Sequence, residues 1–295
     1  MKFRNIKEKL KVAGFLFPSY SVFVIFIFIP LIYSLVLSLF KYSLLSYKSP
    51  KFIGLLNYKT LIKDPIFWVS LKNTVIFTIG TVFPLMIIGL LIAIILNTKL
   101  KFRNFFRVSS FIPVVTSLVA ASIIWSLILD STSSGLLNFF LIKLGVEPQA
   151  WLSSSKWALF SVMVMYVWKN LGYIMLIYLA GLQSIPENLY EAASIDGANE
   201  FQKFFHITLP LLKPTTNFVF TTSIIGSFQV FTPIYIMTGG GPGYSSNTIV
   251  NYLYQKGFQD FKMGYASSIA YILFAILFLI TVVQRKYFSS EEIMY

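Results

Sequence analysis

The sequence predicts an all-α membrane protein with six transmembrane helices, folded as a single domain over residues 1–295. Its composition is 56% hydrophobic and only 12% charged, with a mean hydropathy of +0.74, whereas about a quarter of the residues of a soluble domain are charged. Six apolar runs reach the length of about 20 residues that a helix needs to cross a bilayer. No polar segment between them is long enough to bury a core of its own, so we expect no separate soluble domain.

The apolar runs place the expected spans. The first run is too long for the apolar core of a signal peptide and has no small-residue cleavage site, so we expect it to remain in the protein as a span. The spans are expected at about residues 12–40, 75–96, 108–129, 157–182, 215–237 and 264–284.

The charge pattern predicts the orientation of these spans. An even number of spans puts both termini on one side, and Lys and Arg concentrate in cytoplasmic connections. The short connection NTKLKFRNFFR, residues 97–107, carries four of these residues and no acid. We therefore expect this connection and both termini to be cytoplasmic, although the lysines of the first external loop, residues 41–72, argue mildly against it.

Several classes of chemistry are absent from the sequence. Cysteine is missing and His206 is the only histidine, which excludes disulfides, thiol chemistry and any Cys/His metal cluster. No G-x-x-x-x-G-K-[ST] phosphate loop occurs, and TGGGPG at residues 238–243 has the composition of a tight turn. The net charge of +13 suits helix ends in the headgroup region better than nucleic acid. We expect no catalytic residues, metal or cofactor in this chain.

The loop between the fourth and fifth spans, residues 184–213, combines acidic residues with helix signals. Four of the eleven acidic residues lie in it: Glu187, Glu191, Asp196 and Glu200. Ser184 and Glu187 have the spacing of a capping box, and Pro186 suits a first helical turn. Gly197 can take the left-handed conformation that ends a helix, and Asn199 can cap the next one. The pattern predicts two short helices joined at a glycine corner.

Two functions are open for this loop on physical grounds alone. It is either an amphipathic connector that lies on the bilayer with its phenylalanines in the lipid, or a projecting helix that docks onto a soluble partner.

A longer motif favours the second function. Residues 191–210 read Glu-Ala-Ala, three residues, Gly, nine residues, Ile-x-Leu-Pro. This resembles the cytoplasmic coupling loop of the membrane subunits of binding-protein-dependent ABC importers. Four segments of the chain resemble carbohydrate importer permeases, at residues 52–74, 106–125, 181–198 and 238–258. The last segment is similar to the maltose-type first membrane subunit; the chain lacks that subunit's large external insertion and is more similar to the shorter raffinose-, multiple-sugar- or glycerol-phosphate-type permeases.

The resemblance implies a type I ABC importer transmembrane domain with cytoplasmic coupling helices, in the bacterial cytoplasmic membrane. It implies ATP-driven import of an oligosaccharide or a related sugar or polyol. The implied partners are a second homologous permease, two ATPase subunits that hold Mg-ATP, and an extracytoplasmic solute-binding protein. The residues implied in coupling are Glu191, Ala192, Ala193, Asp196 and Gly197. The residues implied in the loop framework are Ser184, Pro186, Ile207, Leu209 and Pro210.

Polar residues inside two spans are candidates for lining the substrate path. Tyr166, Lys169, Asn170 and Tyr173 share one face of the fourth span, and the fifth span offers Ser223, Ser227 and Gln229. Polar groups at this depth face either a cavity or a neighbouring helix, so substrate lining and helix packing are both open. A lysine at the centre of a span costs about 3 kcal/mol, so Lys169 needs a partner.

Two other transport functions compete with sugar import. A glycerol-phosphate importer would need a cationic pocket, which Lys169 could supply. An ion-gradient-driven secondary transporter would need intramembrane Asp, Glu or His relays and repeated halves, and no Asp or Glu lies well inside a span. The sequence predicts neither the sugar nor which of the two permeases holds it.

Overall fold

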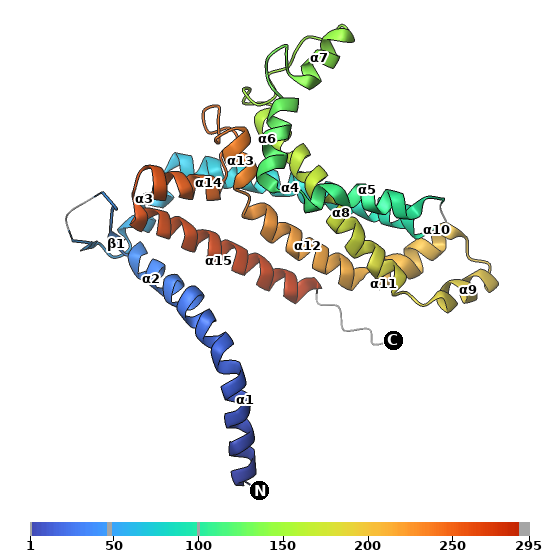
Figure 1. The fold of residues 1–295 in the computed structure, drawn as a ribbon, viewed down its shortest axis with the longest axis horizontal. Coiled ribbons are helices and arrows are strands. Elements are labelled where there is room, and N and C mark those ends of the chain that lie inside the picture. Colours follow the sequence, from blue (N-terminus) through green and yellow to red (C-terminus); the bar gives the residue numbers. More distant parts are fainter. Residues whose placement is uncertain (1, 46–48, 99–100, 289–295) are drawn as a thin grey trace. The chain divides into compact units, whose positions relative to one another are not determined.

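The structure is a computed structural model that describes residues 2–45, 49–98 and 101–288. Lys99, in the basic connection noted above, lies outside the described residues. The chain divides into two compact units, one made of residues up to Asp64 with Leu253–Leu273, the other of Pro65–Tyr252 with residues from Phe274 onward. Both units are almost entirely helical (Figure 1), which confirms the all-α class. The assignment of residues 1–295 to a single domain stays a prediction.

The first unit contains the first span and an adjoining hairpin. Its elements are α1 (Lys2–Phe23), the π-helix η1 (Val24–Phe28), α2 (Ile29–Ser38), β1 (Phe40–Lys41), β2 (Lys51–Phe52), α3 (Leu56–Ile62), η3 (Gln255–Gln259) and the first part of α15 (Met263–Phe288). The two-residue strands pair antiparallel. The Asn57 side chain donates to the backbone oxygens of Ser38 and Phe40, at 2.7 and 3.0 Å, and so ties α3 to the end of the first span.

The second unit contains the middle spans and the loop of interest. Its elements are α4 (Pro65–Asn97), α5 (Arg103–Val115), α6 (Leu118–Ile128), α7 (Leu136–Lys143), α8 (Ala158–Gln183), α9 (Glu187–Ile195), α10 (Glu200–Lys203), the π-helix η2 (Phe204–Thr208), α11 (Leu209–Leu211), α12 (Lys213–Phe228), α13 (Thr232–Met237) and most of α14 (Ile249–Tyr254). Helix α4 packs against both α8 and α12, and α5 packs along α8.

Glycine permits the close approach of these helices. A Cβ at Gly89 on α4 would lie 2.8 Å from the Ile174 side chain on α8, and one at Gly172 on α8 would lie 2.1 Å from the Ser110 backbone oxygen on α5. Small residues at such crossings let helix backbones meet in a membrane, where the lipid supplies no hydrophobic force between helices. Gly172 therefore fixes where α5 can lie on α8.

The spans agree in place with the sequence prediction, but two of them are interrupted, the third at residues 116–117 and the fifth at residues 229–231. Among the described residues, five helical stretches are long and apolar enough to cross a membrane, and a sixth is counted if the α5–α6 pair is one span. That pair is bent by 97°, so the third expected span consists of two helices. Pro113 lacks the N–H for a helical hydrogen bond, and the β-branched Val114, Val115 and Thr116 that follow are weak helix formers. The backbone is extended at Thr116, where the helix stops.

The glycine-rich segment forms a turn, as predicted, and this turn is anchored on α4. Gly239, Gly240 and Gly243 all have positive φ. The buried Asn73 side chain donates to the backbone oxygens of Tyr244 and Asn247, at 2.9 and 3.0 Å. These bonds give both carbonyls a side-chain donor from α4 and so hold the irregular backbone of the turn on that helix.

Candidate functional site

The first helix of the acidic loop begins two residues later than predicted, with its N-cap at Pro186 instead of Ser184. Ser184 does not cap the first loop helix; its hydroxyl donates to the Gly181 backbone oxygen at 2.7 Å and ends α8 instead. Pro186 holds the N-cap position of α9 in an extended conformation, and Glu187 is the first helical residue. The Ser184–Glu187 capping box was therefore wrong, because the serine side chain bonds backward to the helix it leaves.

Helix α9 projects with little packing of its own. None of its residues is buried, and Ile195 is 87% exposed. Glu191 and Ala192 are also exposed, while Ala193 is half-buried. The Tyr190 hydroxyl lies 2.9 Å from the Thr208 hydroxyl and attaches the helix to the far end of the loop.

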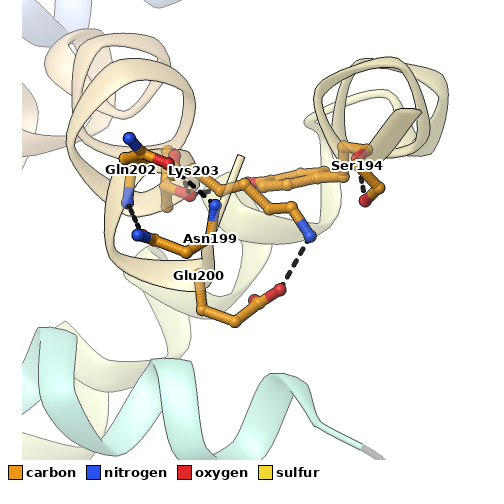
Figure 2. A network of polar contacts seen from close by, with 7 residues as sticks. Ser194, Asn199, Glu200, Gln202 and Lys203 are labelled. Atoms are coloured by element: carbon orange, nitrogen blue, oxygen red, sulfur yellow. Dashed lines mark hydrogen bonds and ion pairs between the residues drawn. The ribbon is translucent and has the colours of Figure 1, made fainter. Parts of the chain in front are cut away.

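The corner after α9 has the predicted geometry. Gly197 has a φ of +81°, and a side chain there would meet open space, so the backbone angle alone requires glycine. Asn199 and Gln202 then form a capping box, each side chain bonding the other's backbone N–H at 2.9 Å. Figure 2 shows this box beside the 2.7 Å ion pair of Lys203 with Glu200. The corner is a fixed bend of the backbone.

The second half of the loop packs against the spans and holds the loop in place. After α10 the chain makes one π-turn, η2. Phe201 in α10 is 72% exposed, whereas Thr208 at the end of η2 is buried. Ile207 packs on the buried cluster of α4 and α8, whereas Leu209 is 38% exposed and Pro210 is exposed. The loop is therefore anchored through its second half and free along its first.

A polar cavity of about 260 Å³ lies between two helix interruptions in the second unit. One interruption is the α5–α6 bend; the other separates α12 from α13 at residues 229–231. Non-helical backbone at membrane depth is tolerated only where protein buries it or where it lines a water-filled cavity. The cavity is lined by Leu118, Tyr166, Lys169, Asn170, Gly226, Gln229, Val230, Phe231, Thr232 and Pro233.

Lys169 has a defined partner in this cavity. Its Nζ donates to the Val114 backbone oxygen at 2.8 Å. Val114 lies in the last turn of α5, whose carbonyls have no helical donor beyond Val115. The ammonium thus supplies the missing donor and the positive charge that a helix C-terminus favours, which accounts for a lysine within a span.

The predicted lining residues fall into two groups. Tyr166, Lys169, Asn170 and Gln229 line the cavity. Tyr173 is 45% exposed and is not among the lining residues. Ser223 and Ser227 are buried, and the Ser227 hydroxyl lies 3.1 Å from that of Thr81 on α4. These two serines therefore pack between helices and do not line the cavity. Phe231 and Thr232 line the cavity at the second interruption, and sequence reasoning did not single them out.

The fold and the site define an integral membrane transport subunit. Residues 74–289 match the family model described as the binding-protein-dependent transport system inner membrane component. The chain belongs to this family, and it is therefore a permease subunit of an ABC importer, a transport component of the inner membrane.

Named relatives match over nearly the whole chain. The arabinooligosaccharides transport system permease protein AraP of Bacillus subtilis (strain 168) is 39% identical over 97% of this chain and 92% of its own length. The lactose transport system permease protein LacF of Rhizobium radiobacter is 35% identical over 98% and 97%. The sulfoquinovosyl glycerol transport system permease protein SmoG of Agrobacterium fabrum (strain C58 / ATCC 33970) is 34% identical over 98% and 93%.

A solved structure has the same fold. A chain of a bacterial alginate ABC transporter, in complex with an alginate pentasaccharide-bound periplasmic protein, superposes with a TM-score of 0.85 over 96% of both chains at 22% identity. The fold is that of the type I ABC importer transmembrane domain, as predicted.

Proposed function

We propose that this chain is the membrane-spanning permease of an ATP-driven importer for an oligosaccharide or a related sugar or polyol. The cavity between the two helix interruptions carries the proposal. Support also comes from the relatives, which are named for arabinooligosaccharides, lactose and sulfoquinovosyl glycerol.

The lining chemistry suits a saccharide. Tyr166 offers an aromatic surface to sugar C–H groups, and the side chains of Asn170 and Gln229 offer planar hydrogen-bonding groups. The Asn170 amide nitrogen donates to the Tyr166 backbone oxygen at 2.8 Å, which leaves the side-chain oxygen without a partner among the described residues. An acceptor that lines the cavity favours a ligand hydroxyl, because leaving it unpaired once the ligand excludes water costs about 1–3 kcal/mol.

The energy is proposed to enter through α9. The sequence has no phosphate loop, so ATP binds and is hydrolysed on two separate subunits. The exposed face of Glu191, Ala192 and Ile195 contacts one of them, with Asp196 and Gly197 at the corner. ATP-driven closure moves α9, and the anchored half of the loop passes this motion to α8 and α12. The contact switches the spans because its energy differs between the inward-open and outward-open states.

The remaining partners follow the family pattern. A second homologous permease completes the path, and an extracytoplasmic binding protein delivers the substrate. The chain crosses the bacterial cytoplasmic membrane with both termini and α9 on the cytoplasmic side, the side on which ATP is available.

Uptake into proteoliposomes tests this proposal. The purified complex, with ATP inside and the binding protein with labelled oligosaccharide outside, accumulates label. Asn170→Leu and Gln229→Leu lower the uptake about tenfold, while Tyr173→Phe on the same helix leaves it unchanged. Uptake without ATP but with an ion gradient would replace the proposal by a secondary transporter. Uptake of glycerol phosphate in preference to sugars would show that the substrate is an anionic polyol phosphate and not a neutral sugar.

A further inference from the structure

Two arginines meet at the start of α5. They lie four residues apart, on one face of the helix. With the Gln183 amide turned so that its oxygen faces them, this oxygen lies 2.6 Å from an Nη atom of Arg103 and 2.9 Å from an Nη atom of Arg107. Two cations therefore share one neutral acceptor, supplied by the last turn of α8.

This arrangement leaves donors unused. Each guanidinium has five N–H donors, and the Nε atoms of Arg103 and Arg107 are buried with no hydrogen-bond partner among the described residues. No carboxylate of the described residues forms an ion pair with either arginine. Like charges at this spacing repel, so an oxyanion between them would relieve the repulsion and use the free donors. Arginine binds phosphate in a bidentate manner, which suits such a site.

The surroundings of the pair indicate where the phosphate comes from. Phe102, Phe105 and Phe106, in the same two turns, are 78%, 67% and 50% exposed. They lie at the beginning of a candidate span, which is headgroup depth in a bilayer. Aromatic side chains next to cations at this depth are typical of contact with anionic lipid. A soluble phosphate would engage the arginines alone, whereas a lipid engages the arginines with its phosphate and the phenylalanines with its acyl chains.

We propose that the notch formed by Arg103, Arg107 and Gln183 binds the phosphate of an anionic phospholipid, with its acyl chains along Phe105 and Phe106. The site needs only a chain embedded in a membrane. It does not depend on the ATPase, the binding protein or the sugar, so it stands or falls separately from the proposed function.

Native mass spectrometry of the full-length chain, released from nanodiscs of phosphatidylcholine with 30% phosphatidylglycerol, measures the lipids retained. The wild type retains phosphatidylglycerol at least fivefold above its share of the bilayer. Arg103→Gln combined with Arg107→Gln lowers retention to the bulk ratio. Lys143→Gln combined with Lys156→Gln removes the same charge and keeps the enrichment. A size-exclusion profile like that of the wild type establishes that each variant is folded.

Two further outcomes would overturn the proposal. One is equal enrichment in the double-arginine variant and the wild type. The other is stabilisation of the chain by inorganic phosphate, in pure phosphatidylcholine nanodiscs, to the extent that phosphatidylglycerol gives, since the site would then take free phosphate. If the folded double-arginine variant cannot be obtained, Gln183→Leu tests the same notch, because loss of the shared acceptor lowers the enrichment about twofold or more.

Discussion

The ammonium of Lys169 donates to the backbone oxygen of Val114 at 2.8 Å, one turn or less before the third span bends by 97°. This bond joins α8 to the open end of α5. It explains how a lysine is accommodated in a span, and it places a positive charge at the interruption that lines the polar cavity.

Removal of this bond should loosen the bend. A hydrogen bond to a charged group contributes about 1.5–3 kcal/mol, enough to shift a two-state equilibrium by roughly 10- to 100-fold. In Lys169→Met we therefore expect α5 and α6 to sample straighter arrangements. The distribution of electron–electron distances between spin labels at positions 108 and 124 should broaden in Lys169→Met and stay narrow in Lys169→Arg. Equally narrow distributions in all three proteins would show that Lys169 does not hold the bend.

Gly197 should be sensitive to backbone conformation and not to side-chain volume. A residue with a side chain in the left-handed conformation costs about 1–2 kcal/mol, but asparagine tolerates it better than other residues. Gly197→Val should lower ATP-driven uptake about tenfold at equal membrane levels, and Gly197→Asn should retain at least half. Full uptake by Gly197→Val would remove the corner from the coupling mechanism.

Asn73 should contribute to stability through the glycine-rich turn. Asn73→Leu removes the two hydrogen bonds from this side chain to the Tyr244 and Asn247 backbone oxygens, and each contributes about 0.5–1.5 kcal/mol. Denaturant titration of the purified chain should show a free energy of unfolding about 1–3 kcal/mol lower. The exposed Asn188→Leu serves as a control and should change it by less than about 0.5 kcal/mol. Equal losses in the two variants would contradict this role.

The contribution of the loop after α6 to the stability of the protein should depend on pH through Asp130. The hydroxyl and the backbone N–H of Thr132 both donate to this carboxylate and lower its pKa below the ordinary value. A depressed pKa in the folded state means that the stabilisation is present above the ordinary carboxyl pKa of about 4 and is lost as the pH falls through the lower folded value. The stability difference between wild type and Asp130→Asn should therefore be constant from pH 5 to 8 and shrink below about pH 4. A difference that persists unchanged at pH 2 would exclude this linkage.

The sequence predicted the features that follow from local composition. The spans follow from long apolar runs, and the loop corner follows from a glycine whose φ is +81° and from Asn199, whose cap needs only the next three residues. Ser184 misled the prediction because a serine at a helix junction can bond either way along the chain. Here it bonds to Gly181.

The cavity was only half predictable. Tyr166, Lys169 and Asn170 share a helical face, so their grouping follows from period alone. The interruptions that complete the cavity depend on which backbone groups find partners in three dimensions. Val114 finds Lys169, 55 residues away, and Ser227 finds Thr81 instead of the cavity. Neither pairing leaves a trace in a single sequence.

The central claim, that exposed α9 receives the driving motion from another polypeptide, is tested most directly by cross-linking at Ile195. The chain contains no cysteine, so Ile195→Cys carries a thiol-linked photoreactive group at one position. In membranes with the complete transporter, illumination should give an adduct with the ATPase subunit, whereas Leu144→Cys, at the end of α7 and 77% exposed in the native residue, should give none. Adducts with lipid alone at position 195, in a complex that still transports, would contradict the account.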